Sequence, residues 1–271
     1  MAEITAKLVN ELRAKTGQGM MECKKMLAEA GGDIEKAIEL FRKKGVKASL
    51  TERAATEGRV FGAKNGDAKA AALVEVNCNT DFTAKSDPLA RVGSKAAAAL
   101  ASNPNGDASA AVAQDLTDVA QTTGENVRLG KTAALTSPAG KVGLYTYGIT
   151  GKIGVIMAFE GNVANVSDEL VSDLGGHIAF ARPAGLDRST IDPALVAKER
   201  EIAVEQAKAT GKPQQIAEKI AEGKLNAFFA EKALLDQEFF NASKFKGSVG
   251  QMLKEKGLTL TNYKRLEVGQ A

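Results

Sequence analysis

Apolar residues recur at helical spacing through the first 47 residues of the chain. Thr5 can cap a helix whose Val9 and Leu12 share one face, and Gly17 ends that helix. Asp33 begins another helix, whose apolar positions fall at i, i+3, i+4 and i+7: Ile34, Ala37, Ile38 and Phe41. Because a further helical run lies between them, the pattern predicts a three-helix bundle over residues 1–47.

The pattern changes after the bundle. Residues 48–60 mix charge with Ala and Gly and lack apolar periodicity, so they predict a linker. Residues 71–77, AALVEVN, alternate like a strand, and residues 86–102 form a helical pattern with Pro88 in its first turn. We therefore expect a first core subdomain over residues 61–140.

A second set of strands and helices follows. Residues 141–161 predict a β-hairpin, because two β-rich runs flank a glycine-containing turn, and residues 166–183 predict a helix. The chain returns to this region at residues 231–271 with a short helix and a last strand. Residues 141–188 and 231–271 thus predict a second core subdomain, and the whole chain predicts an α+β fold.

Residues 189–230 differ from both subdomains because they contain two helical patterns joined by a Gly–Lys–Pro connection. The apolar faces of these helices consist of Leu195, Ile202 and Val204 on the first and Ile216, Ile220 and Leu225 on the second. Antiparallel helices with so narrow an apolar seam predict a projecting coiled-coil hairpin. Such a hairpin would contact a partner, a second copy of the chain, or both.

Composition narrows the class of protein. The 271 residues carry a formal charge of +3, which is too slight for the concentrated basic surface typical of nucleic-acid binders. The N-terminus has no apolar core of signal-peptide length, and no stretch of the chain approaches a membrane span. Cys23 and Cys78 lack metal-ligand spacing. We therefore expect two free thiols, no metal site, no membrane contact and a cytoplasmic location.

The sequence offers little for catalysis. The only histidine, His177, lies in a predicted helix beside apolar residues, where a structural role is more common than a catalytic one. Residues 130–132, GKT, match the tail of a phosphate-binding loop, but five residues separate Gly124 from Gly130 where that loop has four. The expected helix before the motif and strand through it also differ from that loop. We expect no catalytic residue, no cofactor and no direct nucleotide binding.

Asp81 and Phe82 follow the strand predicted over residues 71–77, at a place where a solvated loop is expected. Two interpretations fit this position. Phe82 could turn back into the core with Asp81 as a capping acid, or both side chains could point outward toward another protein. The residues alone favour the core, because large aromatic side chains are usually mostly buried.

Several stretches carry a family resemblance. Residues 12–27, LRAKTGQGMMECKKML, and residues 75–85, EVNCNTDFTAK, are similar to the two signatures of bacterial elongation factor Ts. Further matches occur in the family's order: GEN at 124–126, YGITGKIGV at 147–155, GKPQQIAEKIAEGKL at 211–225 and RLEVG at 265–269. The resemblance implies a guanine-nucleotide exchange factor for elongation factor Tu, with a UBA-like N-terminal bundle, and not an enzyme.

The resemblance also implies roles for particular residues. The segment Thr80, Asp81, Phe82 and Thr83 would insert beside the nucleotide site of elongation factor Tu. Phe82 would act there as an apolar wedge, and Asp81 would disturb the shell around the partner's Mg²⁺. Other residues would bind the partner: Leu12, Arg13, Met20, Met21, Lys24, Thr123, Gly124 and Tyr147. On this basis Asp81 and Phe82 are expected to point outward.

The chain departs from the family pattern at Met26, Asn79, Thr83, Thr123 and Tyr147. Thr83 stands where Val is usual, and its hydroxyl should slightly disfavour burial. Tyr147 stands where relatives often carry a histidine. Some relatives also continue into a C-terminal helical module, and we expect the partner contact of that module to be absent here.

Two other functions are weighed against exchange. A small-molecule enzyme is disfavoured because the sequence lacks an acid–base constellation. A ribosome- or RNA-associated protein without exchange activity is the main alternative, and its binding should weaken steeply with rising salt.

Overall fold

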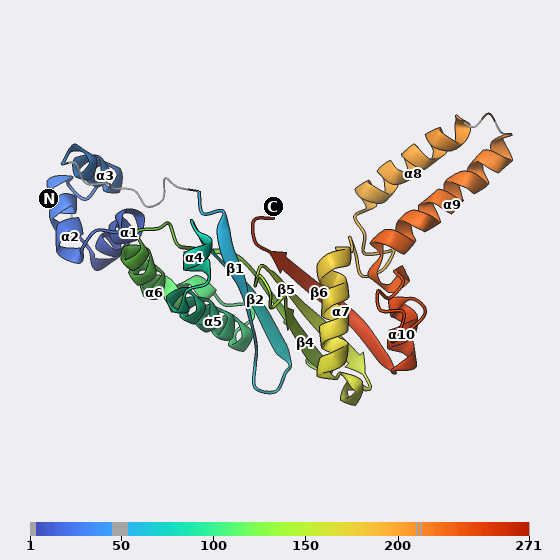
Figure 1. Cartoon of the computed structure of the whole chain (residues 1–271). Coiled ribbons are helices and arrows are strands. Elements are labelled where there is room, and N and C mark those ends of the chain that lie inside the picture. Colours follow the sequence, from blue (N-terminus) through green and yellow to red (C-terminus); the bar gives the residue numbers. More distant parts are fainter. Residues whose placement is uncertain (1–3, 45–53, 210, 212, 271) are drawn as a thin grey trace.

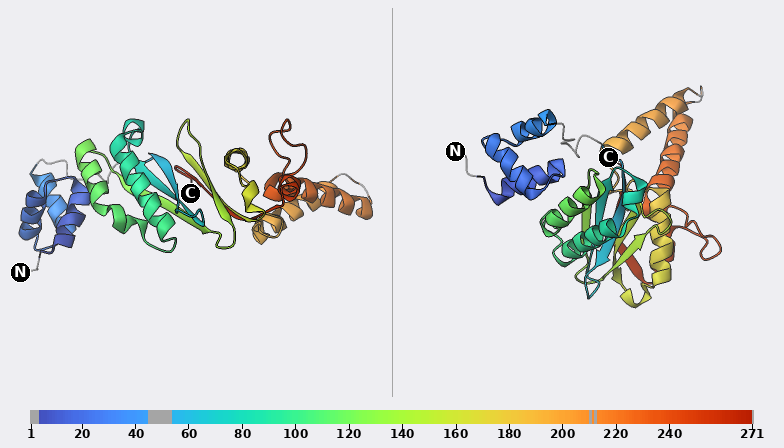
Figure 2. Two further views of the ribbon diagram at one scale, coloured as in Figure 1. Left: turned by 90° about the horizontal axis from the view of Figure 1, so that it is seen from below. Right: turned by 60° about the vertical axis from the view of Figure 1, so that its left-hand side comes forward.

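The computed structural model describes residues 4–44, 54–209, 211 and 213–270. A helical bundle lies at one end of the molecule, a body of strands and helices lies in the middle, and a helical hairpin projects at the other end (Figure 1). Figure 2 shows the same order from two further directions. The mixture of helices with antiparallel sheets confirms the predicted α+β class.

The N-terminal bundle consists of α1 (Ala6–Thr16), α2 (Met20–Glu29) and α3 (Ile34–Lys43). Caps set its boundaries as predicted. The side chain of Thr5 accepts a hydrogen bond from the backbone N–H of Leu8, and Gly17 ends α1 in the left-handed conformation at φ 68°. Leu12, Leu27 and Phe41 are buried together in its small core.

The first half of the body is a three-stranded antiparallel sheet in the order β1-β2-β3. The strands are β1 (Glu57–Lys64), β2 (Ala70–Cys78) and β3 (Arg128–Thr136), and the helices are α4 (Asp81–Ala84), α5 (Asp87–Ser102) and α6 (Ala108–Thr123). The buried side chains of Val74, Val76 and Cys78 on β2 pack with those of α5.

The start of β1 differs from the sequence expectation, since Glu57–Val60 lie inside the range 48–60 predicted as a linker. This run contains Gly58 and shows no apolar alternation that could predict a strand. It is held by backbone pairing with β2, in which Glu57 lies opposite Cys78. Residues 48–53 of the predicted linker lie outside the described residues.

The second half of the body repeats the arrangement with a sheet in the order β4-β5-β6. Its elements are β4 (Lys141–Thr146), β5 (Ile153–Gly161), β6 (Leu258–Glu267), α7 (Asp168–Ala181), α10 (Val249–Glu255) and the short 3-10 turns Val163–Asn165 and Leu234–Asp236. The pairing of β4 with β5 confirms the predicted hairpin.

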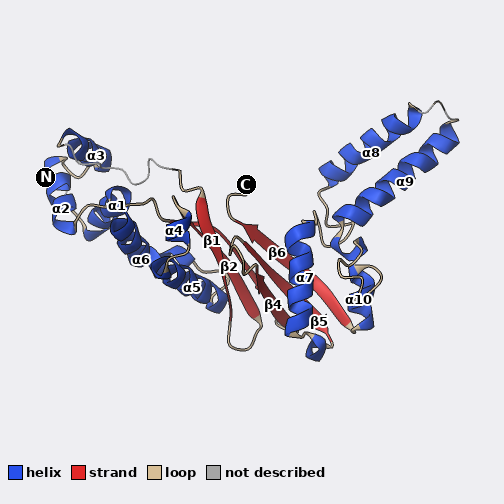
Figure 3. Cartoon of the chain, viewed as in Figure 1, coloured by secondary structure: helices blue, strands red, loops and turns tan. Residues whose placement is uncertain are grey.

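The two sheets lie between the helices of the body (Figure 3). Leu73 and Val60 of the first sheet pack with Val142 and Ile156 of the second in one buried cluster. Gly154 permits this close approach, because a Cβ there would lie 2.7 Å from the side chains of Leu73 and Val60.

The projecting hairpin consists of α8 (Pro193–Lys208) and α9 (Gln214–Lys232). Its seam is built mainly from alanines: Ala203, Ala207, Ala217 and Ala221. The predicted seam is therefore wrong for Leu195, Ile202 and Ile216, which are exposed. It is right for Val204 and Ile220, which pack against the alanines, and for Leu225, which is buried. Alanine allows the helices to approach closely, and the three exposed residues fall outside that contact. The predicted contact of the hairpin with a partner or a second copy stays a prediction.

Candidate interaction site

The segment after β2 forms a short helical turn that presents an aromatic side chain to solvent. Thr80 caps α4, and its hydroxyl oxygen accepts a hydrogen bond from the backbone N–H of Thr83 at 3.3 Å. Thr83 and Ala84 occupy the buried side of this turn, whereas the side chain of Phe82 is 83% exposed. The interpretation that Phe82 turns back into the core is therefore wrong.

Asp81 lies beside Phe82 on the exposed side of the turn. Its carboxylate accepts a hydrogen bond from the Lys85 ammonium at 2.8 Å. This hydrogen bond and the positive charge of Lys85 lower the pKa of Asp81 below its ordinary value. The Asp81 carboxylate is therefore fully ionised at neutral pH and available to an external cation or hydrogen-bond donor.

The turn is anchored by Glu125, which lies in the GEN segment after α6. The helix ends at Gly124, in the left-handed conformation at φ 67°. The Glu125 carboxylate accepts hydrogen bonds from the backbone N–H groups of Asn79 and Thr80 and from the hydroxyls of Thr80 and Thr83. Sequence reasoning named the neighbouring residues of this segment and missed Glu125. The sequence contained a signal for this contact. The GEN motif offers a carboxylate that can accept hydrogen bonds, and the motif at residues 75–85 offers two threonine hydroxyls that can donate them.

Thr83 is only 6% exposed, and its hydroxyl donates to Glu125 Oε1 at 2.8 Å. The expectation that this hydroxyl disfavours burial is wrong, because a satisfied hydrogen bond removes the cost of burying it. Asn79, another departure from the family pattern, also contributes to the anchor. Its side chain accepts from the backbone N–H of Asn126 at 2.8 Å and donates to the carbonyl of Ala54 at 3.0 Å.

The turn between β4 and β5 lies at the same edge of the body as α4. The backbone N–H of Val60 donates to the carbonyl of Gly151 at 2.8 Å, and Lys152 forms an ion pair with Glu57 at 2.7 Å. Because Glu57 lies opposite Cys78, these contacts bring the turn close to the end of β2.

Tyr147, one of the predicted contact residues, lies at the start of that turn. Its half-buried ring meets the exposed ring of Phe180 edge to face, with 5.1 Å between the centroids. Ile149 at the tip is 82% exposed. Phe82 and Tyr147 thus lie at the same edge of the body, although they are 65 positions apart in the sequence.

The predicted contact residues of the bundle separate into two groups. Met20, Met21 and Lys24 are exposed at the start of α2. Leu12, in contrast, is completely buried, and Arg13 is 8% exposed and donates to the Gln121 side chain of α6 at 3.2 Å. In this structure Leu12 and Arg13 hold the bundle together and against the body, and Leu12 offers no surface for contact with a partner.

Thr123 and Gly124 lie at the C-terminal end of α6, directly before Glu125. The hydroxyl of Thr123 donates to the carbonyl of Val119 at 2.8 Å, so this side chain is used within the helix. Gly124 is exposed and leaves open space where a Cβ would lie. The structure therefore makes Gly124 accessible beside the α4 turn.

His177 is buried and has structural partners. Its Nε2 lies 2.8 Å from the side-chain oxygen of Gln237, and its Nδ1 accepts the backbone N–H of Phe240 at 3.3 Å. Burial lowers the pKa of His177 below its ordinary value, although the hydrogen bond to Gln237 acts in the opposite direction. These contacts confirm the predicted structural role of this histidine.

Both cysteines are free thiols buried in the protein, as predicted. Within the part of the chain that the structure describes, His, Cys, Asp and Glu side chains form no group suited to binding a metal ion. The same part contains no helix long and apolar enough to cross a membrane.

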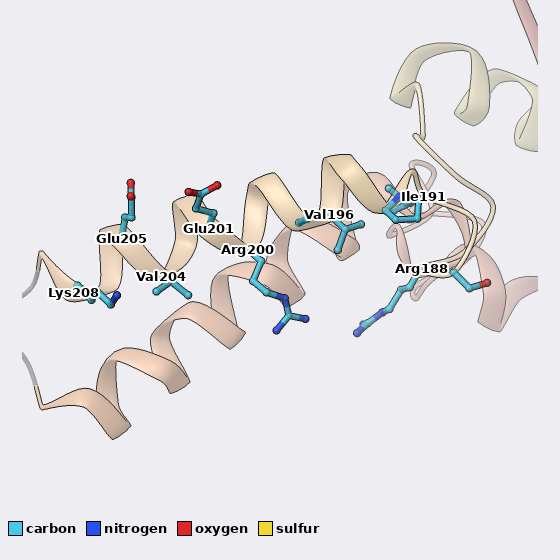
Figure 4. A pocket seen from close by; sticks show the side chains of 11 residues that line it. Arg188, Ile191, Val196, Arg200, Glu201, Val204, Glu205 and Lys208 are labelled. Atoms are coloured by element: carbon cyan, nitrogen blue, oxygen red, sulfur yellow. The ribbon is translucent and has the colours of Figure 1, made fainter.

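An open groove of about 700 Å³ runs along α8, away from the α4 turn. Figure 4 shows that Glu201 and Glu205 on this helix point away from α9. The groove is lined by Arg188, Ile191, Val196, Arg200, Val204 and Lys208 among others. Its volume is in the range of ligand sites, and its lining combines apolar side chains with the charged side chains of Arg188, Arg200 and Lys208.

Comparisons with known proteins agree with the arrangement of the motifs. Residues 79–270 match the family model described as Elongation factor TS. The chain is 40% identical to elongation factor Ts of Methylococcus capsulatus, over 98% of this chain and 92% of the relative. It is 40% identical to elongation factor Ts of Thioalkalivibrio sulfidiphilus with the same coverage. It is 38% identical to elongation factor Ts of Photorhabdus laumondii, over 100% of this chain and 94% of the relative.

Proposed function

Because the chain belongs to the elongation factor Ts family, we propose that it binds elongation factor Tu in its GDP form and promotes exchange of GDP for GTP. The observation that carries this proposal is the exposure of Phe82 on an anchored turn. A large aromatic side chain held out of the core adds little to the stability of its own fold. It becomes buried only when a partner covers it.

The size of that gain can be estimated. Full burial of a Phe side chain is worth about 1.5–3 kcal/mol by area. Since about 1.4 kcal/mol corresponds to tenfold in an equilibrium or rate constant, Phe82 supplies roughly one to two decades of the exchange effect. Further acceleration must come from other contacts. The exposed residues Met20, Met21, Lys24 and Gly124 and the half-buried Tyr147 are the candidates for those contacts.

The exchange mechanism requires no covalent step. In the complex, Phe82 enters an apolar slot of elongation factor Tu, and Asp81 disturbs the ligand shell of the bound Mg²⁺. Because Mg²⁺ neutralises the diphosphate, a disturbed shell weakens GDP binding. The coupling is reciprocal, so GDP weakens binding of the exchange factor to the same extent. The chain itself works in the cytoplasm without cofactor, bound nucleotide or catalytic residue.

A GDP-release assay tests the proposal. Elongation factor Tu loaded with fluorescent GDP is mixed with excess unlabelled GDP and increasing amounts of this protein. The wild-type chain should accelerate release, and Phe82→Ala should reduce the acceleration by about 10- to 100-fold. Phe240→Ala, which removes another exposed phenylalanine (59% exposed), is the matched control and should retain activity.

The possible outcomes separate two errors. If the wild-type chain leaves the release rate unchanged, the proposed exchange function is wrong. If the wild type is active and Phe82→Ala is equally active, the function stands and the wedge is assigned to the wrong residue.

A further inference from the structure

We propose that Glu125 is a positioning residue that holds the Thr80–Thr83 turn, and with it Phe82, in the conformation used on the partner. This proposal rests on the proposed exchange function and deepens it. Glu125 belongs to the loop after α6, 42 positions from Thr83 along the chain. A side chain distant in sequence therefore shapes the exposed turn.

The carboxylate of Glu125 is fully used by this turn. Its Oε2 accepts the backbone N–H groups of Asn79 at 2.9 Å and Thr80 at 3.1 Å. Its Oε1 accepts the hydroxyls of Thr80 at 2.7 Å and Thr83 at 2.8 Å. An ionised carboxylate accepts hydrogen bonds only and offers about four lone-pair sites, so the match to four donors is close to complete.

The turn depends on this anchor because it cannot sustain itself. α4 spans only Asp81–Ala84, and an isolated helix of one turn is unstable in water. The Phe82 ring contributes little internal packing, since the side chain is 83% exposed. The direction of Phe82 is therefore fixed by the Thr80 cap and the hydrogen bonds to Glu125, together with the packing of the buried side of the turn.

The anchor acts through the negative charge. In the described part of the chain Glu125 forms no ion pair with Lys or Arg, so its charge is balanced by hydrogen-bond donors alone. Burial acts to raise the pKa of Glu125, but the hydrogen bonds from Thr80, Thr83 and Asn79 outweigh it and hold the pKa below its ordinary value. Glutamine replaces this acceptor only in part, because its amide oxygen can accept two of the four hydrogen bonds, whereas its NH₂ is a donor and the side chain carries no negative charge.

Two readouts test the positioning role, beginning with hydrogen exchange of the free protein. In Glu125→Gln, the backbone amides of Asn79 and Thr80 should lose protection by about tenfold or more, whereas amides in the middle of β2 should stay protected. Glu169→Gln is the matched control, since Glu169 forms an exposed ion pair with Lys244 at 2.8 Å. Unchanged protection at Asn79 and Thr80 in Glu125→Gln would overturn the proposal, whatever the protein's function.

The second readout is a double-mutant cycle in the GDP-release assay. Glu125→Gln should slow release by about tenfold in the wild-type background and by less than about twofold in the Phe82→Ala background. A merely structural loss would slow both backgrounds by the same factor, and that result would overturn the positioning role. If the wild type accelerates release and Glu125→Gln is as active, this inference alone fails. If the wild type does not accelerate GDP release, the proposed function fails. The hydrogen-exchange experiment on the free protein then still decides whether Glu125 holds the turn.

A milder variant covers the case in which Glu125→Gln does not fold. Thr83→Val preserves the shape of the side chain and removes one of the four donors. It should slow GDP release by about two- to fivefold in the wild-type background. It should have no further effect when combined with Phe82→Ala in one protein. Equal slowing in both backgrounds would count against the proposal here as well.

Discussion

Two turns lie at one edge of the body, and they hold their aromatic residues differently. Phe82 projects from α4 with 83% of its side chain exposed, and polar contacts fix the backbone beneath it. Tyr147, at the start of the β4–β5 turn, is half-buried and packs against Phe180 of its own chain. The first turn is anchored by a carboxylate, and the second by aromatic packing.

Because of this difference, substitutions at the two positions should affect partner binding and protein stability differently. Removing Phe82 takes away almost no internal contact, so any loss of activity must arise in the complex. Removing Tyr147 takes away packing within the second subdomain, so its effects combine a loss of stability with any loss of contact. The comparison therefore decides which variants report directly on partner binding.

The largest expected effect comes from removing both aromatic residues. The two side chains belong to different halves of the body and have separate anchors. Their contributions to the logarithm of the release rate should therefore add. Phe82→Ala combined with Tyr147→Ala should slow GDP release by about two to three decades, compared with one to two for Phe82→Ala alone. The measurement is the release rate of all four members of the cycle at saturating protein. A double variant no slower than Phe82→Ala would show that Tyr147 makes no independent contact.

A smaller effect is expected on stability. Tyr147→Ala should lower the free energy of unfolding by about 1–2 kcal/mol, because the ring contact with Phe180 is lost. Phe82→Ala should stay within about 0.5 kcal/mol of the wild type. Urea denaturation measures both. Tyr147→Phe retains the ring and should be as stable as the wild type; equal destabilisation by Phe82→Ala and Tyr147→Ala would contradict the comparison.

The same contrast explains what the sequence could predict. Periodic segments with clear caps were predicted well, as at Asp33 of the bundle and at Pro88 of α5. β1 was missed at Glu57 because backbone pairing with β2, and not an alternating pattern, creates the strand. The hairpin seam was predicted only in part, because alanines such as Ala203 and Ala217 form most of the contact between the helices, and apolar spacing alone did not single them out.

For the candidate site, local motifs identified Phe82 and Tyr147 but not their surroundings. Whether a Phe after a strand turns inward depends on what occupies the buried side of the turn, and Thr83 and Ala84 occupy it here. Glu125 escaped notice because its role appears only when two segments distant in sequence meet. Leu12, whose motif suggests partner contact, is buried because the same residue fills the core of the bundle.

The pH dependence of stability should also differ between the two regions. His177 lies on α7, the helix that carries Phe180, and burial holds its pKa below the unfolded value of about 6.5. A group with a lowered folded pKa stabilises the protein above the unfolded pKa, and that stability is lost as pH falls through the folded pKa. The free energy of unfolding should therefore decrease as pH falls from 7 toward 5, by at most about 1.4 kcal/mol per pH unit.

Glu125 should add to the pH dependence of stability only at lower pH, because its pKa is held below the ordinary glutamate value of about 4.3. Its stabilising effect on the α4 turn should be present above that value and be lost as pH falls through the lowered pKa. Urea denaturation of the wild type and of His177→Gln at pH 7, 6 and 5 separates the two groups. The variant should show a flatter dependence over this range, and an identical slope would remove His177 from the explanation.

The smallest expected effect is chemical and concerns the thiol beneath the α4 turn. Cys78 is completely buried, and its Sγ donates to the carbonyl of Thr80 at 3.2 Å. Burial, assisted by the negative charge of Glu125, raises the pKa of Cys78 to about 11. At pH 8 only about one thiol in a thousand is then the reactive thiolate.

A disulfide reagent such as DTNB should react far more slowly with Cys78 in the folded protein than in guanidinium chloride. The rate is measured in the Cys23→Ala variant, so that Cys78 is the thiol that reacts. Rapid labelling of the folded protein would mean that the turn opens readily, and would contradict the conclusion that polar contacts hold Phe82 on an anchored turn.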